Sequence, residues 1–313
     1  MRELAALTRA RLQASLAQVE ALGVTRVISL GAPPAAVPGV PAEACLAVPL
    51  VDEDHADLLS ALPACVAFAE RAAADGASLL IACHAGAAPA CDTPKHAAER
   101  LCAAGVSRSA AVATAVLMAR EQLAADAALA AVQAAHPAAA PNEGFCTQLQ
   151  LFGDMRCSLD DEHAPYRRFR VAQLAAAHAA GTARASDASA VLCADPSNVG
   201  RDTAGTLRCR MCRRLVAAGE HIVAHERGAG AGAFDPRKRG KGTHVSEACS
   251  SIFVEPLAWM APALEDMAVE GKLMCPKCAG RLGGFCWAGA QCSCGAWVVP
   301  AFQLHAARVD VTR

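Results

Sequence analysis

The stretch that decides the fold is Cys102-Ala-Ala-Gly-Val-Ser-Arg-Ser109, which runs into the apolar residues 110–118. A short Gly-containing turn that enters a helix points backbone N–H groups inward, and with the helix dipole it forms an anion site. Such a site stabilises first a nucleophilic thiolate and then the phosphoryl oxygens. An arginine adds a planar fork that grips two phosphate oxygens at once. The pattern therefore predicts a loop in which Cys102 attacks a phosphate monoester bound by Arg108.

The loop supplies most of the predicted site. Cys102 is the expected nucleophile, Arg108 binds the phosphate, and Ser109 belongs to the catalytic set. Cys83 is the alternative nucleophile. The residues expected to surround the substrate phosphate are Ala103, Ala104, Gly105, Val106, Ser107 and Arg108.

A phosphate ester also needs a proton for its departing oxygen, so an acid must face the nucleophile. Asp52 is a suitable candidate because it follows a predicted strand at residues 45–50. By residue chemistry alone Asp54 and Asp57 are nearly as good, and a solvated or helix-capping role stays open for each.

Strands and helices alternate in the first half of the chain. Apolar, β-branched segments at residues 25–30, 45–50 and 78–82 predict strands. Helical patterns follow at 4–19, 57–74 and 109–118, with Pro63 expected to bend or break the second of these. Asn142 is the predicted N-cap of a helix to about residue 155. The alternation predicts an α/β fold, a central sheet flanked by helices, with ligands at the carboxyl ends of the strands.

Length and composition bound the architecture. A chain of 313 residues suits two domains, which we place at 1–160 and 206–313, with a connection at 161–205. The net charge is −1 and no uncharged apolar run is long enough for a bilayer, so we expect no membrane association. The charged N-terminus does not resemble a secretory signal, and 16 cysteines then indicate metal binding and catalysis in a reducing compartment.

Close-spaced cysteines begin at residue 209. A two-residue turn between cysteines lets both thiolates reach one Zn²⁺, which takes four tetrahedral S or N ligands. Full four-ligand sites predict two structural zinc ions, completed by a small core that contains all three tryptophans. Sequence order groups the ligands as Cys209, Cys212, His225 and Cys249 for one ion and Cys275, Cys278, Cys292 and Cys294 for the other. An interleaved grouping and the substitution of His221 for His225 both stay open.

These motifs resemble a known family. Cys102-x-x-Gly-x-Ser-Arg-Ser109 and its apolar helix, residues 48–52 and 57–59 upstream, and Asn142-Glu-Gly-Phe145 downstream are similar to the dual-specificity protein phosphatases. The resemblance implies a cysteine-phosphatase fold and hydrolysis of phosphotyrosine and phosphoserine/threonine through a cysteinyl-phosphate intermediate. It also selects Asp52 as the general acid. A rhodanese-like sulfurtransferase is disfavoured by the Ser-Arg-Ser and Asp52 context.

The C-terminal motifs are similar to one subgroup of that family. Cys249-Ser-Ser-Ile-Phe-Val-Glu-Pro-Leu-Ala-Trp-Met260, residues 271–278 and residues 291–303 look like its two-zinc domain. That resemblance implies phosphoprotein substrates and, as an alternative function, zinc-dependent maturation of the large (60S) ribosomal subunit, in which phosphatase activity is weak or dispensable. The expected partner is then a pre-60S particle, and the expected location is nucleus and cytoplasm. The basic loop at residues 237–239 could contact RNA phosphates or serve as a nuclear address.

The loop as written departs from the family in two ways. Leu101 stands where the family has histidine before the nucleophile, and the residues before Cys102 are polar instead of a buried strand. The predicted strand at 78–82 leads instead into Cys83-His84-Ala85-Gly86. Removal of residues 87–105 would join Gly86 to Val106 and give the sequence Cys-His-Ala-Gly-Val-Ser-Arg-Ser. We hypothesise that 87–105 is a retained intervening sequence, and a genuine surface insertion is the alternative. The family's first strand also has no counterpart at the N-terminus.

Overall fold

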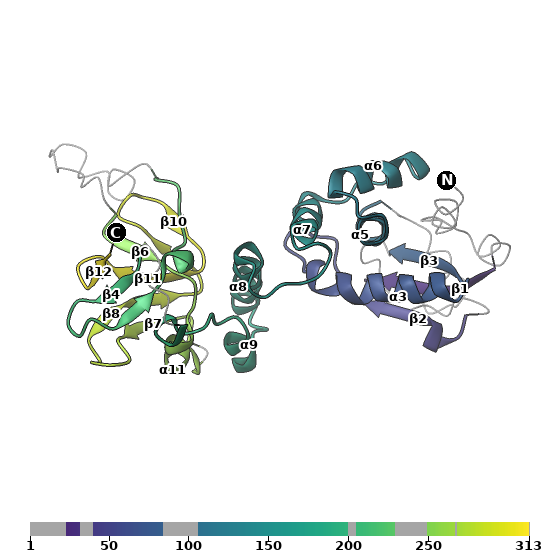
Figure 1. The fold of residues 1–313 in the computed structure, drawn as a ribbon. Helices are drawn as coiled ribbons and strands as arrows, with labels where there is room; N and C mark the ends of the chain where they lie inside the picture. The colour runs from purple at the N-terminus through teal and green to yellow at the C-terminus, as the bar shows by residue number, and fades with distance from the viewer. Residues whose placement is uncertain are drawn as a thin grey trace. The chain divides into compact units, whose positions relative to one another are not determined.

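The structure is a computed structural model, and it describes residues 23–31, 40–83, 106–199, 205–228, 249–266 and 268–312. The chain divides into two compact units, Met1–Asp160 and Asp161–Arg313 (Figure 1). The predicted helix at 4–19 and the basic loop at 237–239 lie outside the described residues. No helix in the described ranges is long and apolar enough to cross a membrane.

Unit 1 contains a parallel three-stranded sheet in the order β2-β1-β3. Its strands are β1 (Val24–Leu30), β2 (Cys45–Val48) and β3 (Ser78–Cys83), so the three predicted strands and the α/β class are confirmed. Leu30 pairs with Val48 on one side and with Cys83 on the other. The carboxyl ends of all three strands therefore meet at one edge of the sheet.

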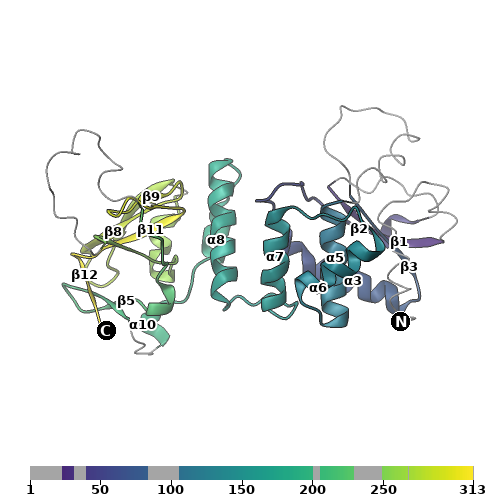
Figure 2. The ribbon, with the colours of Figure 1, turned by 90° about the horizontal axis from the view of Figure 1, so that it is seen from above.

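Helices cover this sheet. They are α3 (Leu62–Ala74), α5 (Arg108–Glu121), α6 (Ala125–Ala135) and α7 (Glu143–Asp154), with short 3-10 turns η1 (Ala42–Ala44) and η2 (Leu59–Ala61). α5 packs against β3, α3, α6 and α7, and Figures 1 and 2 both show α5 and α7 side by side. Because α5 is covered on several sides, most of its side chains are buried and apolar. This burial explains why its sequence reads as a continuous apolar run.

The first half of the predicted helix at 57–74 is broken at Pro63, as predicted, because residues 59–61 form the 3-10 turn η2 and not α-helix. α3 begins at Leu62, after η2, and Pro63 lies in its first turn. A proline is tolerated there because the first N–H groups of a helix have no intrahelical partner. The predicted N-cap is confirmed, since the side chain of Asn142 accepts a hydrogen bond from Phe145 N at 2.8 Å.

Unit 2 combines small antiparallel sheets with short helices. One sheet has the order β12-β4-β5 and another the order β6-β11-β8-β7, and β9 pairs with β10. The strands are β4 (Leu207–Cys209), β5 (Leu215–Ala217), β6 (Ser251–Phe253), β7 (Glu270–Met274), β8 (Arg281–Cys286), β9 (Ala290–Gln291), β10 (Trp297–Val298), β11 (Ala301–His305) and β12 (Val309–Val311). The helices are α8 (Ala164–Ala179), α9 (Ala185–Ala190), α10 (Pro196–Val199) and α11 (Ala261–Leu264), with 3-10 turns η3 (Gly219–His221) and η6 (Ala258–Met260).

The described part of the expected connection (161–205), residues 161–199, belongs to unit 2 instead. Val171 and Leu174 of α8 are buried in the same core as Leu207 and Phe302. His178 stacks on Trp287 with ring centroids 4.5 Å apart. The apolar face of α8 needs a partner and finds it in this core.

The tryptophan prediction is correct for two of three residues. Trp287 and Trp259 are buried, and the indole N–H of Trp259 donates to Val216 O at 2.9 Å. Trp297 is 62% exposed on β10 and does not belong to the core.

Candidate functional site

The candidate active site lies where the carboxyl edge of the sheet in unit 1 meets the first turn of α5. Cys83 is the last residue of β3, and Arg108 is the first residue of α5. Positive partial charge at a helix N-terminus favours an anion at this point. Cys102 and residues 103–105 of the predicted loop lie outside the described residues, whereas Cys83 lies within them.

Cys83 contacts the predicted catalytic set directly. Its Sγ lies 3.3 Å from Ser109 Oγ, and both residues are almost completely buried. When the sulfur is a thiolate, only the serine hydroxyl can donate in this contact. Ser109 therefore has the position of a group that stabilises negative charge on this sulfur.

Arg108 is buried, with 5% of its surface exposed. Its Nη1 donates to Leu50 O at 2.9 Å and also lies 3.5 Å from Leu30 O. Its Nε makes no hydrogen bond among the described residues and lies 3.7 Å from Asp52 Oδ2. A buried N–H donor without a hydrogen-bond partner is costly, so an additional acceptor at Nε would stabilise this guanidinium.

Gly31 makes room for this arginine, a role that the sequence analysis missed. The residue follows β1 with φ +96°, and a Cβ built on it would lie 2.0 Å from Arg108 Nη1 and 2.9 Å from Leu50 O. The only sequence signal is a glycine directly after a buried strand.

We expect Gly31→Ala to lower kcat/KM for an aryl phosphate by about tenfold or more, because the new methyl group displaces the guanidinium. Gly76→Ala is the matched control, since Gly76 also has positive φ (+64°) but nothing lies within 4 Å of its Cβ position. Steady-state kinetics of both variants separate steric displacement from backbone strain. Equal losses in the two variants would contradict the assigned role of Gly31.

Asp52, the predicted general acid, lies beside Ser107 and Arg108 at the start of α5. Its Oδ1 accepts hydrogen bonds from Ser107 Oγ at 2.6 Å and from Asn142 Nδ2 at 3.0 Å. Ser107 Oγ in turn accepts from Asn142 N at 3.2 Å. The predicted phosphate-loop residue Ser107 thus holds the candidate acid, and Val106 O accepts from Ala140 N at 2.8 Å.

Two groups of potential metal ligands occur among the described residues of unit 2. In each group the ligand atoms all lie within 4.8 Å of one another. The members are Cys209, Cys212, Cys275 and Cys278 in the first group, and His225, Cys249, Cys292 and Cys294 in the second. All eight predicted ligands are used, and His221 belongs to neither group.

The grouping predicted from sequence order is wrong, and the interleaved arrangement is correct. Cys278 and Cys292 are close in sequence, but β8 (Arg281–Cys286) lies between them. Six extended residues span roughly 20 Å, so the cysteines before and after this strand reach different groups. Cys275 and Cys278 instead join the turn that follows β4, with Cys212 Sγ 3.6 Å from Cys275 Sγ.

Both cysteine turns of the first group share one backbone conformation. The residue after the second cysteine, Arg213 or Ala279, has positive φ (64° and 54°). A backbone N–H at Arg214 then donates to Cys212, which lowers the pKa of Cys212 to about 7. In the second group, N–H groups of Gly228 and Ala296 lower the pKa of Cys294 to about 6. Burial and the neighbouring thiols raise the pKa of the partner Cys278 to about 12 and that of Cys249 to about 11. The thiols of each group therefore do not all ionise easily without a cation to offset their charges.

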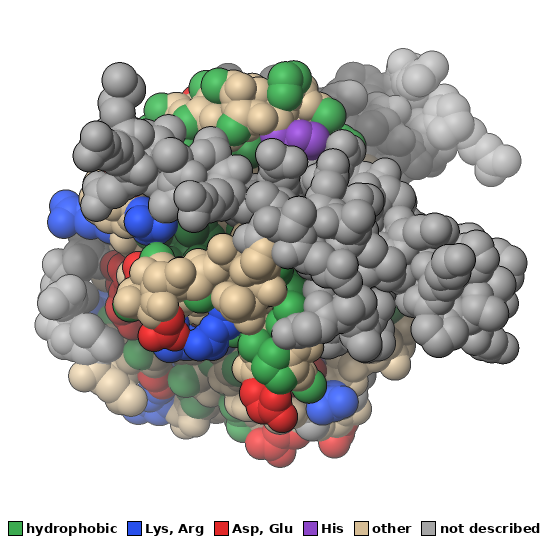
Figure 3. Space-filling view, turned by 90° about the vertical axis from the view of Figure 1, so that its right-hand side faces the viewer, with side chains coloured by type: hydrophobic (Ala, Val, Ile, Leu, Met, Phe, Trp, Pro, Cys, Tyr) green, Lys and Arg blue, Asp and Glu red, His purple; other side chains and the backbone are tan. Residues whose placement is uncertain are grey.

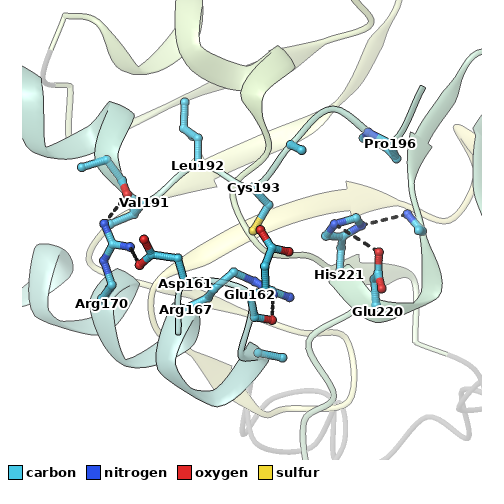
Figure 4. A pocket seen from close by; sticks show the side chains of 14 residues that line it. Asp161, Glu162, Arg167, Arg170, Val191, Leu192, Cys193, Pro196, Glu220 and His221 are labelled. Atoms are coloured by element: carbon cyan, nitrogen blue, oxygen red, sulfur yellow. Dashed lines mark hydrogen bonds and ion pairs between the residues drawn. The ribbon is translucent and has the colours of Figure 1, made fainter. Parts of the chain in front are cut away.

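A pocket of about 420 Å³ lies in unit 2 against α8 and η3 (Figure 4). Its charged groups have partners: Arg170 bonds Asp161 at 2.6 Å, and Arg167 Nε donates to the buried Glu255 at 2.9 Å. The Cys193 thiol lies 3.3 Å from the same carboxylate. Burial and the charge of Glu255 raise the pKa of Cys193 to about 12, which disfavours the nucleophilic thiolate form.

Charges of both signs occur on the surface of unit 1. On the face drawn in Figure 3, acidic and basic side chains lie next to one another.

The chain is similar to known proteins. The family model described as "Dual specificity phosphatase, catalytic domain" matches residues 101–155. Dual specificity protein phosphatase 12 of Rattus norvegicus is 36% identical over 92% of this chain and 80% of its own length. A probable inactive dual specificity protein phosphatase-like protein of Arabidopsis thaliana is 56% identical over 33% of this chain and 71% of its own length. The crystal structure of human DUSP28 is 30% identical, covering 48% of this chain and 93% of that chain, with a TM-score of 0.37.

Proposed function

Because the chain belongs to the dual specificity protein phosphatases, in the subgroup of dual specificity protein phosphatase 12, we propose that it hydrolyses phosphotyrosine and phosphoserine/threonine through a cysteinyl-phosphate intermediate formed on Cys83. One observation carries this assignment: Cys83 Sγ lies 3.3 Å from Ser109 Oγ, at the N-terminus of the helix that begins with Arg108. Cys102 stays the second candidate for the nucleophile, because it precedes Arg108 by the spacing expected of the phosphate-binding loop.

In the first step, the thiolate attacks phosphorus, an S–P bond forms, and the P–O bond to the substrate breaks. Arg108 binds two equatorial oxygens, and Asp52 gives its proton to the departing alkoxide or phenoxide. In the second step, Asp52 takes a proton from water, whose oxygen attacks phosphorus. The S–P bond then breaks, which releases inorganic phosphate and returns the thiolate to its hydrogen bond from Ser109.

Arg108→Lys tests this proposal. We expect a loss of about 100-fold or more in kcat/KM, because an ammonium is a point charge and cannot reproduce the bidentate grip. Arg120→Lys, on the last turn of the same helix, is the control and should keep wild-type turnover. Turnover of phosphotyrosine and phosphothreonine peptides by both variants is the measurement. A purified protein that hydrolyses neither peptide, or an Arg108→Lys variant that keeps most of its activity, would refute the assignment.

We propose zinc as the ion for both ligand groups of unit 2. Sulfur ligands about 2.3 Å from a tetrahedral ion lie roughly 3.8 Å apart. The sulfur separations in the first group, 3.6 Å between Cys212 and Cys275 and 3.8 Å between Cys209 and Cys278, are consistent with this value. Four protein ligands close each site to substrate, so the ions are structural.

A second candidate function is ribosome assembly. In support, unit 2 has its own core and two closed metal sites, which suits a binding module better than a catalytic domain. We propose that it binds a pre-60S particle, in nucleus and cytoplasm, independently of catalysis. Cosedimentation of wild-type protein and Arg108→Lys with such particles tests this: equal binding is expected, and no binding by either protein would remove the candidate function.

A further inference from the structure

Asp52 lies on a loop without regular secondary structure between β2 and η2. A proton donor must lie within hydrogen-bond reach of the leaving oxygen, so contacts with neighbouring residues must hold this loop in position. Besides Ser107 and Arg108, which contact Asp52 from the start of α5, the contacts to this loop come from α7 and its N-cap.

Gln148 of α7 makes three hydrogen bonds to the backbone just after Asp52. Its Oε1 accepts from Leu58 N and Leu59 N, both at 2.9 Å, and its Nε2 donates to Ala56 O at 2.9 Å. The residue is buried, with 3% exposure. These partners fix the orientation of the amide, because only its oxygen can accept from two N–H groups.

The first turn of α7 holds the same loop closer to the acid. Asn142 Oδ1 caps the helix by accepting from Phe145 N, which leaves Nδ2 to donate to Asp52. Two positions further along the loop, a Cβ on Gly144 would lie 1.8 Å from Asp54 O, so the backbones of α7 and the loop are in contact there. Gly144 and Gln148 are four residues apart and share one face of the helix.

We infer that Gln148 and Asn142 are positioning residues that hold Asp52 for proton transfer, and that the same face of α7 sets the efficiency of leaving-group protonation. This inference rests on the proposed role of Asp52 as general acid. A merely structural role would affect all substrates alike, whereas loss of positioning must affect substrates with poor leaving groups most.

The test compares kcat/KM for an activated aryl phosphate, p-nitrophenyl phosphate, with that for phenyl phosphate. Gln148→Met keeps the length of the side chain but removes all three hydrogen bonds. We expect it to lower kcat/KM for phenyl phosphate about tenfold more than for the activated ester. Gln150→Met, on an exposed position of the same helix, should change neither value.

A second variant keeps the inference testable if Gln148→Met fails to fold. Asn142→Asp retains a good N-cap but replaces the donor that faces Asp52 with a carboxylate, so it should show the same selective loss. Asp52→Asn is measured in parallel. When Asp52→Asn is combined with either variant, the ratio of kcat/KM for p-nitrophenyl phosphate to kcat/KM for phenyl phosphate should equal that of Asp52→Asn alone, because the positioning residues act through Asp52.

The outcomes are distinguishable. Equal losses on both substrates, or an additional selective loss in the double variants, would overturn the positioning role while the acid assignment stands. An unselective Asp52→Asn variant would remove Asp52 as the general acid and this inference with it.

Discussion

Cys83→Ser is expected to abolish turnover of p-nitrophenyl phosphate, whereas Cys102→Ser is expected to keep most of it. The reason is the geometry at the edge of the sheet. Cys83 ends β3 and contacts Ser109, so its sulfur lies at the helix N-terminus that stabilises both the thiolate and the bound phosphate. A serine hydroxyl at this position is a far weaker nucleophile than a thiolate. Mass spectrometry of rapidly quenched protein should locate the phosphorylated cysteine.

Deletion of residues 87–105 provides the control for this experiment. It joins Gly86 to Val106 and brings Cys83 within the same five-residue distance of Arg108 that Cys102 has in the full chain. We expect the deletion variant to be at least as active as the full chain and to lose all activity on Cys83→Ser. An inactive deletion variant, together with brisk turnover through Cys102 in the full chain, would refute both the assignment of Cys83 and the retained-insert hypothesis.

The sequence predicted the parts of the fold that depend on local patterns. Continuous apolar segments are typical of strands buried on both faces, and all three predicted strands of unit 1 form a parallel sheet. Asn142 was predicted as an N-cap because its side chain acts three residues away in sequence. Its second hydrogen bond, to Asp52 ninety positions away, depends on tertiary structure and has no local signal.

Errors arose where distance in sequence is a poor guide to distance in space. The ligand pairs that contain Cys278 and Cys292 were assigned to one ion because few residues separate them. The extended strand β8 lies between these two cysteines, and they belong to different ligand groups. Gln148 and Gly31 were missed for the opposite reason. Each contacts segments that only the folded sheet and helices bring near, and neither residue type alone indicates catalysis.

The largest expected effect on stability follows removal of the metal ions. The first ligand group joins the turn after β4 to the turn between β7 and β8, and Cys209 and Cys275 belong to the main core of unit 2. Binding energy in such modules is folding energy, on the order of ten kcal/mol per ion. Without metal, the thiolates would lie close together without a compensating cation. We therefore expect a strong chelator to unfold unit 2.

Tryptophan fluorescence reports this transition selectively, because all three tryptophans lie in unit 2 and Trp259 and Trp287 are buried. Emission should shift to longer wavelength with chelator and return with added zinc. Phosphatase activity is the internal control. It should survive chelation, since the candidate active site belongs to unit 1, which has a separate sheet and separate helices.

Zinc stoichiometry of double variants distinguishes the interleaved grouping from the sequential one. Native protein should contain about two zinc ions, as measured by elemental analysis. Cys212→Ser with Cys278→Ser removes two ligands of one group and should leave about one ion, whereas Cys212→Ser with Cys249→Ser damages both groups and should leave none. The sequential grouping predicts the reverse for both pairs, because it assigns Cys212 and Cys249 to the same ion. A metal-free protein that keeps buried tryptophan emission would show instead that the core of unit 2 folds without either ion.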